Sequence, residues 1–168
     1  MPERPLRIFV LGSFRDFGRR TGTSSELLRR HVAGLRELGW DAFMSGDRRS
    51  REIAGTGLGA WPMTERLEPL CDLAVFVVTR RGREGGWASE LAALQSRHPE
   101  RAGRRLVMLP QGHGLSRVLD PAHEGLLADP PVLISEWTDE QDLLAQVSTY
   151  AAFLGQWDRL PAPWEYRL

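Results

Sequence analysis

The sequence predicts a single α/β domain in which a parallel sheet is covered by helices on both faces. Short apolar segments alternate along the chain with longer amphipathic segments, which is typical of repeated βαβ units. The clearest apolar segment, residues 73–78 (LAVFVV), shows no alternation with polar residues, as in a strand buried on both faces. A length of 168 residues, with 42% hydrophobic and 26% charged residues, fits one globular domain.

The order of these segments favours a five-stranded parallel sheet within a flavodoxin-like or Rossmann-like three-layer sandwich. Residues 45–59, rich in Gly, Ser and Arg, are expected to form a loop, and residues 155–168 a Pro- and Trp-rich tail beyond a core of about 6–154. The expected strands are 6–11, 40–44, 73–78, 105–109 and 131–134, and the expected helices are 26–38, 62–70, 87–97, 139–154 and a short one near 115–119.

The simplest strand order for such a chain is 2-1-3-4-5, with right-handed crossovers. Ligands of open α/β sheets bind outside the carboxyl ends of the strands, where the strand order reverses. That point lies between the first and third strands. We therefore expect residues 12–15 to lie beside residues 80–90, and a ligand to bind there.

Composition excludes several classes of function. The formal net charge is zero and the pI is about 6.9, so no nucleic-acid partner is expected. No apolar segment approaches the roughly 18 residues of a membrane span, so we expect no membrane partner and a cytoplasmic location. All 22 basic residues are Arg, which leaves anion binding to guanidinium groups and backbone amides. The single Cys71 permits no intrachain disulfide, and no motif indicates a metal or another cofactor.

The exit of the first strand lacks the GxGxxG pattern of dinucleotide-binding proteins, and no phosphate-binding P-loop motif occurs in the chain. The exit instead supplies Gly12, Ser13, Phe14 and Arg15, either as ligand contacts or as an ordinary loop.

The exit of the third strand carries Arg80, Arg81 and Arg83. Three guanidinium groups at a ligand-binding edge suit phosphate recognition, and the alternative is a solvated arginine-rich turn.

Glu90 is the candidate for chemistry, because it follows the strong third strand in the first turn of a helix expected from Trp87. Two glycines upstream, Gly85 and Gly86, permit a ligand to approach the backbone. The alternative is that the acid offsets the helix macrodipole. The other acid of this segment, Glu84, is expected in the loop.

The turn after the fourth strand, with Gly112 and His113, is a further candidate contact at the same edge. Ser13 and Ser116 have no evident His–Asp partners, so a hydrolase triad is not expected. His31 is expected on the surface of its helix.

Three clusters resemble the nucleoside 2-deoxyribosyltransferase superfamily, and within it the 2'-deoxynucleoside 5'-phosphate N-hydrolases. Residues 7–15 (RIFVLGSFR) are similar to the family's first strand and substrate loop. Residues 71–92 are similar to its acid, apolar strand and G-x-x-x-E-L segment, with Gly86 and Glu90-Leu91 on the motif positions. Residues 105–119 (RLVMLPQGHGLSRVL) are similar to its phosphate-binding strand, turn and helix.

The resemblance implies that Glu90 is the nucleophile that attacks the anomeric carbon and displaces the base. It also implies a base stacked on Trp87, with Phe14 lining the pocket, and a homodimer. The implied ligands of a 5'-phosphate are Arg15, Arg80, Arg81, Arg83 and the amides of residues 112–116, including Gly112, His113 and Ser116.

Two departures from the family pattern affect the expected chemistry. The Asp that the family carries before its third strand is missing, and only Glu65 stands nearby as an imperfect substitute. The transferases use a C-terminal Asn, and this chain contains no Asn, which favours hydrolysis over transfer. The expected function is cleavage of the base–sugar bond of a nucleotide or nucleoside. The alternatives are a TIR-like NAD glycohydrolase and a non-catalytic nucleotide-binding or sensor module.

Overall fold

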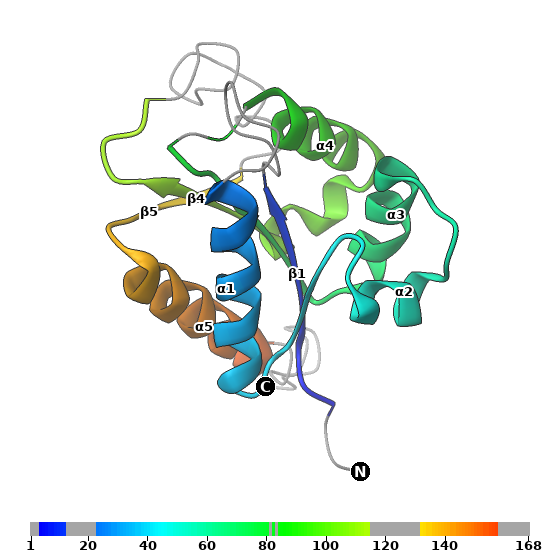
Figure 1. The fold of residues 1–168 in the computed structure, drawn as a ribbon, viewed down its shortest axis with the longest axis horizontal. Helices are drawn as coiled ribbons and strands as arrows, with labels where there is room; N and C mark the ends of the chain where they lie inside the picture. The colour runs from blue at the N-terminus through cyan, green and yellow to red at the C-terminus, as the bar shows by residue number, and fades with distance from the viewer. Residues whose placement is uncertain (1–3, 13–22, 81, 83, 115–131, 158–168) are drawn as a thin grey trace, which may run out of the picture.

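A computed structural model describes residues 4–12, 23–80, 82, 84–114 and 132–157 of the protein. It confirms the five-stranded sheet, in which all strands are parallel and follow the order β2-β1-β3-β4-β5 (Figure 1). The strands are β1 (Arg7–Gly12), β2 (Asp41–Met44), β3 (Leu73–Val77), β4 (Arg105–Pro110) and β5 (Leu133–Trp137). The expected short helix near 115–119 and most of the tail lie outside the described residues.

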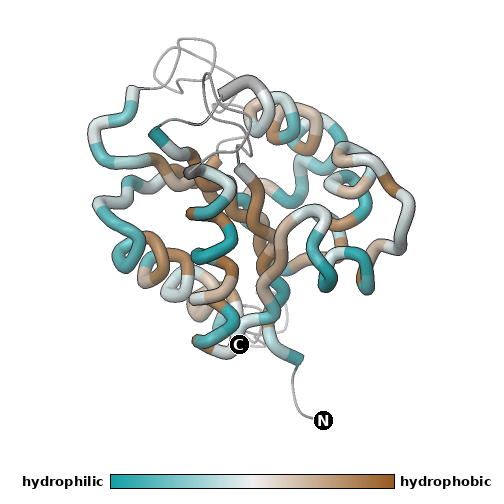
Figure 2. Tube along the Cα trace, viewed as in Figure 1, coloured by the Kyte–Doolittle hydropathy of each residue, from teal (hydrophilic) through white to brown (hydrophobic). Residues whose placement is uncertain are grey.

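Helices form a layer on each face of the sheet. One layer consists of α1 (Thr23–Glu37) and α5 (Glu140–Trp157), and the other of α2 (Arg48–Ala54), α3 (Ala60–Leu67) and α4 (Glu84–Arg97) (Figure 1). Short 3-10 helices, η1 (Glu68–Leu70) and η2 (Pro99–Arg104), precede β3 and β4. The strands between the two layers are the most hydrophobic part of the chain (Figure 2).

Strand β3 lacks an alternation of apolar and polar residues because it is buried on both faces, as the sequence predicted. All five of its residues are buried, and successive side chains enter different cores. Phe76 belongs to the core under α2–α4, and Val75 and Val77 belong to the core under α1 and α5. A central strand therefore needs apolar residues at every position.

The expected loop at 45–59 was wrong, because it contains α2. Asp47 caps this helix by accepting a hydrogen bond from the backbone amide of Ser50 at 2.7 Å. Arg48 pairs with Glu52 one turn later, and Ala54 is buried in the core. The helix ends at Gly55, whose φ of 96° is a conformation that glycine adopts without strain.

Other boundaries also differ from the expected ones. Helix α1 begins at Thr23 and α4 at Glu84, three residues before the expected starts, so Glu84 is helical instead of in a loop. Strand β5 begins at Leu133 and extends to Trp137, because Trp137 is buried against the core while the polar residues before it lie at the sheet edge. Asp139 caps α5 by accepting a hydrogen bond from the backbone amide of Asp142 at 2.9 Å.

A buried ionic cluster joins η1, η2 and β4 at the amino ends of the strands. The Glu68 carboxylate accepts from Arg105 Nε at 3.0 Å and from Arg101 Nε at 3.1 Å, and both Glu68 and Arg105 are fully buried. Arg101 also donates to the carbonyl oxygens of Glu68 and Cys71. Burial removes these charges from water, so each buried charge is stabilised by its partner in the cluster instead of by hydration.

The cluster predicts a large difference between a single and a double substitution. Glu68→Gln leaves the buried Arg105 guanidinium without a counter-charge and should lower the free energy of unfolding by about 3–5 kcal/mol. The double variant Glu68→Gln/Arg105→Met should lose much less. Equilibrium denaturation with urea measures both, and a double variant as unstable as the single one would contradict this account.

Candidate functional site

The carboxyl ends of β1 and β3 lie side by side, as the strand order requires (Figure 1). Gly12, the last residue of β1, is in register with Val77, the last residue of β3. A Cβ atom at Gly12 would lie 2.5 Å from the Val77 carbonyl oxygen, a distance that no side chain tolerates. Gly12 is thus required for the close contact between the two strands.

Three strand exits are joined by hydrogen bonds at this edge. Arg80, just after β3, donates from Nη2 to the Gln111 carbonyl oxygen at 2.7 Å. The Gln111 amide donates to the carbonyl oxygen of Trp137 at the end of β5, at 2.8 Å. Gly112 and His113 continue this turn, and Gly112 has a φ of 73°. The structure therefore brings Arg80 to the turn that carries Gly112 and His113.

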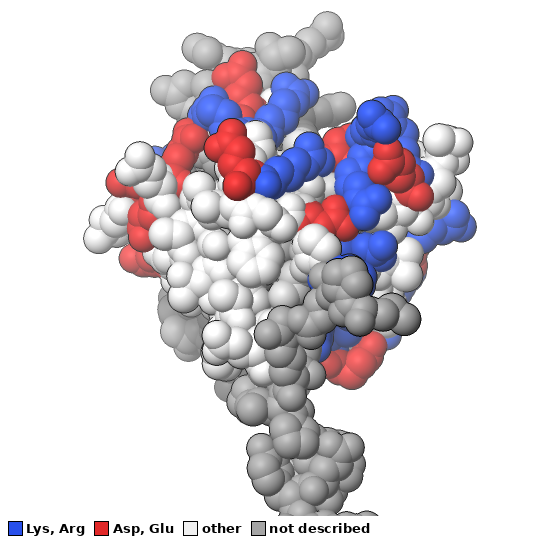
Figure 3. All heavy atoms as spheres, turned by 90° about the horizontal axis from the view of Figure 1, so that it is seen from below, with Lys and Arg blue, Asp and Glu red and all other residues white. Residues whose placement is uncertain are grey.

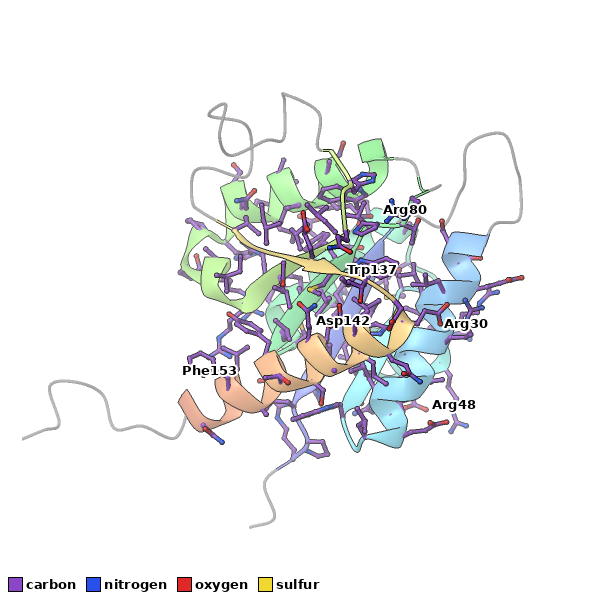
Figure 4. All side chains as sticks on the ribbon, turned by 90° about the vertical axis from the view of Figure 1, so that its left-hand side faces the viewer. Arg30, Arg48, Arg80, Trp137, Asp142 and Phe153 are labelled. Carbon is purple, nitrogen blue, oxygen red and sulfur yellow. The ribbon has the colours of Figure 1, made fainter. Side chains whose placement is uncertain are left out.

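A pocket of about 310 Å³ opens beside Arg80, between the first turns of α1 and α5. At its base, the hydroxyl groups of Ser24 and Thr79 lie 2.5 Å apart and are buried. Figure 4 shows Arg30, Arg80 and Trp137 at this end of the molecule. The pocket is lined by Ser24, Leu27, Arg30, Thr79, Arg80, Trp137 and Glu140.

The charges of this pocket are partly compensated within the protein. Arg30 holds Glu140 by two hydrogen bonds, of 3.0 and 2.5 Å, and these bonds lower the pKa of the Glu140 carboxyl. Arg80 is exposed and has donors beyond the one that bonds Gln111. Arg80 is thus the guanidinium of this pocket best able to bind an anion.

Glu90 lies in the second turn of α4, about 9 Å along the helix from Glu84. Two turns later on the same side of α4, Arg97 contacts Glu65 of α3. Glu90 therefore lies on the side of α4 that faces α3.

The Glu90 carboxyl is half-buried, and no described residue pairs with it. Burial alone raises its pKa to about 7. An interaction of Glu90 with the helix macrodipole does not explain its position, because this interaction falls off within the first turn and Glu90 lies beyond that turn. An unpaired carboxyl with a pKa near neutrality is typical of a functional group.

Glu65 does not join Glu90 as we expected. Its carboxylate pairs with Arg97, whose guanidinium also stacks over the Trp61 ring. Arg97 is the last residue of α4, about 10 Å along the helix from Glu90. The expected role of Glu65 in assisting Glu90 is therefore corrected, because the Glu65 carboxylate pairs with Arg97 near the opposite end of the strands.

The structure also corrects the role of Trp87. Its ring is 1% exposed and belongs to the core between α4 and the sheet, because the helix turns this position toward the sheet. A base cannot stack on a ring in this position. Gly86, one residue earlier, is exposed with open space around it, and remains available to a ligand.

His31 is buried instead of exposed, at 5%, and burial lowers its pKa to about 4. The expected contacts Ser13, Phe14, Arg15, Arg81, Arg83 and Ser116 lie outside the described residues.

Sequence reasoning missed Thr79, Trp137 and the Ser24 hydroxyl as lining residues. The signal available was position alone, because Thr79 follows β3 and Trp137 is the last residue of β5.

No group of three or more His, Cys, Asp or Glu side chains that could hold a metal ion occurs in the described part of the chain. None of the described helices is long and apolar enough to cross a membrane. In comparisons with known proteins, no protein-family model and no curated protein matches this chain.

Burial of Glu90 predicts how stability depends on pH. The folded-state pKa of about 7 exceeds the ordinary value of 4.5, so the folded protein binds more protons between these values and loses stability as pH rises through them. Glu90→Gln removes this cost, and its thermal unfolding midpoint should exceed that of the wild type at pH 8 and match it at pH 5. An equal difference at both pH values would contradict the raised pKa.

Proposed function

We propose that the protein is an N-glycosidase that cleaves the base–sugar bond of a nucleotide or nucleoside, with Glu90 as the nucleophile. The observation that carries this proposal is the half-buried Glu90 carboxyl on α4, the helix that follows β3, with which no described residue pairs. Carboxylates stabilise and then bond to oxocarbenium-like carbon, which is the centre formed when a glycosidic bond breaks.

The reaction would proceed in two displacements. A Glu90 carboxylate oxygen would bond to the anomeric carbon while the bond from that carbon to the base nitrogen breaks, and the base would leave with the electron pair and gain a proton from water. Water would then attack the anomeric carbon and release Glu90. Burial of Glu90 favours this role, because a poorly solvated carboxylate is a stronger nucleophile than a hydrated one.

Arg80 supports a phosphate-bearing substrate. It is exposed at the β3 exit, beside the Ser24–Thr79 hydroxyl pair and the Gly112–His113 turn. Guanidinium groups bind phosphate oxygens through pairs of N–H donors. A nucleoside 5'-monophosphate is therefore favoured over the free nucleoside.

The test of the reaction is release of free base, followed by chromatography, from a panel of nucleosides, nucleoside 5'-monophosphates and NAD. Glu90→Gln should lower the rate by about a thousandfold or more while ligand binding persists. Glu65→Gln is the matched control and should retain activity, because Glu65 pairs with Arg97 away from the site. Nicotinamide as the only product would favour the NAD reaction, and silence from a folded protein would contradict an enzyme.

Activity should depend on the ionisation of Glu90. The carboxylate is the reactive form, so kcat/KM should rise with pH and level off above the pKa of about 7. The profile should be measured between pH 5 and 9 with one monophosphate substrate. A rate that is constant down to pH 5 would contradict Glu90 as the nucleophile.

Arg80 should discriminate between phosphorylated and free nucleosides. Arg80→Gln removes a charge-assisted contact and should raise KM for the monophosphate by roughly 10- to 100-fold, with little change for the nucleoside. Arg48→Gln is the control, since Arg48 is an exposed arginine of α2 that lies apart from Arg80 (Figure 4). An equal loss for both substrates would contradict a phosphate contact.

A further inference from the structure

The pocket beside Arg80 is larger than a phosphate group requires. Its volume is about 310 Å³. Pockets that enclose a whole small molecule begin at about 300 Å³ and extend to about 1,000 Å³. A phosphate bound to Arg80 would therefore leave most of this pocket free for another part of the same ligand.

Arg80 differs from arginines at the other end of the strands that are paired with acids. At the amino ends of the strands, Arg4 pairs with Asp72 at 3.0 Å, and Arg49 pairs with Asp41 at 2.6 Å. Figure 3, which views the molecule from below, shows basic and acidic side chains side by side over this end. Within the residues that the structure describes, no acid pairs with Arg80, so its charge is available to a ligand.

The pocket and Glu90 belong to different faces of the sheet. Residues of α1 and α5, which form one helical layer, line the pocket, and Glu90 is not among its described lining residues. Glu90 lies on α4, in the layer that covers the other face. Figure 4 shows Arg80 between α4 and α1. A nucleoside whose glycosidic bond lies at Glu90 thus leaves the pocket to a group on the far side of its phosphate.

The inner walls of the pocket combine apolar surface with hydroxyl groups. Leu27 and Trp137 provide the apolar surface, and the Ser24 and Thr79 hydroxyls lie at the base. Ligand sites of small molecules are typically lined in this way, by apolar side chains with a few polar groups that fix orientation. A planar base with polar edges suits such walls.

The outer wall of the pocket presents a carboxylate that a ligand can reach. Each oxygen of Glu140 accepts one hydrogen bond from Arg30, at 3.0 and 2.5 Å, and the Glu140 side chain is 47% exposed. Because each carboxylate oxygen can accept a further hydrogen bond, Glu140 retains acceptor capacity. In dinucleotide-binding sheets an acid accepts a hydrogen bond from a ribose hydroxyl. Glu140 could serve a ribose in this pocket in the same way.

We propose that the pocket between α1 and α5 binds a second nucleoside, which is joined to the reacting nucleotide through a pyrophosphate at Arg80. The substrate is then a dinucleotide, and the nucleoside 5'-monophosphate is the part of it that lies on the Glu90 side. This inference rests on the proposed function, because Glu90 defines where the reacting nucleoside lies. Open α/β sheets bind dinucleotides across the point where the strand order reverses, which is between β1 and β3 in this protein.

A linked ligand should bind more tightly than its parts. Once one nucleotide is bound, the second nucleoside is held close to the pocket, so its binding becomes an intramolecular step. Linkage of this kind typically raises affinity by about 10²- to 10⁴-fold. We expect a gain of at least about tenfold for a dinucleotide over a monophosphate.

The test compares diadenosine 5',5'-diphosphate with adenosine 5'-monophosphate by isothermal titration calorimetry. The protein is the full chain with Glu90→Gln, so that no glycosidic bond is broken during the titration. The dinucleotide should bind at least about tenfold more tightly. Leu27→Trp, added to this protein, fills the pocket and should reduce the ratio of the two affinities to about one.

Ala33→Trp is the matched control, because Ala33 is exposed and lies about 120° from Leu27 around α1. It introduces the same side chain on the same helix and should leave the ratio of affinities unchanged. Circular dichroism and thermal unfolding check that both variants are folded. The smaller substitution Leu27→Phe takes the place of Leu27→Trp in the same comparison if that variant is unstable.

The proposal is overturned if the dinucleotide binds no more tightly than the monophosphate. It is also overturned if the Leu27 variant weakens both ligands by the same factor, or if Ala33→Trp abolishes the preference. These results are distinct from a failure of the proposed function. Base release from monophosphates without a preference for the dinucleotide would overturn the second nucleoside site alone. A preference that depends on Leu27, without base release by the wild type, would overturn the reaction alone.

Discussion

Burial of the central strands on both faces is the constraint on which the arrangement of this protein depends. Strands β1, β3 and β4 are enclosed by the two helical layers, so their side chains are committed to packing. Groups that could react or bind are thereby restricted to the strand ends and the helices. Arg80, the Ser24–Thr79 pair and Glu90 follow this rule. Glu68 and Arg105, which are fully buried charged groups, lie at the opposite end of the strands, where they pair with each other.

The sheet could be predicted from sequence because a strand buried on both faces has an unmistakable composition. The run in β3 and the alternation of its neighbours with helical segments predicted a parallel sheet, for which 2-1-3-4-5 was the simplest strand order, and the structure has this order. Helix α2 could not be predicted in the same way, since its stability comes from a capping Asp47 and from ion pairs within an arginine-rich stretch that resembles a loop. A polar composition does not distinguish a loop from a short helix that is buried on only one side.

The candidate site was predictable in position and only partly in its members. The strand ends identify the edge, and Arg80 lies there just after β3, whereas Glu90 lies in the second turn of α4 and does not line the pocket beside Arg80. The environment of each side chain could not be known, because it depends on which way the helix faces. The orientation of α4 about its own axis buries Trp87 and leaves Glu90 half-buried at the side of the helix. The pairing of Glu65 with Arg97 joins two helices that are far apart in sequence.

The close contact at Gly12 has a consequence for how the protein could change its substrate. Since β1 and β3 touch without room for a methyl group, the floor between them is fixed in shape. Any substitution of Gly12 would separate β1 from β3 and break the backbone hydrogen bonds between these two strands. New specificity, natural or designed, must therefore arise from residues around the rim, where a side chain can be exchanged without disturbing the sheet.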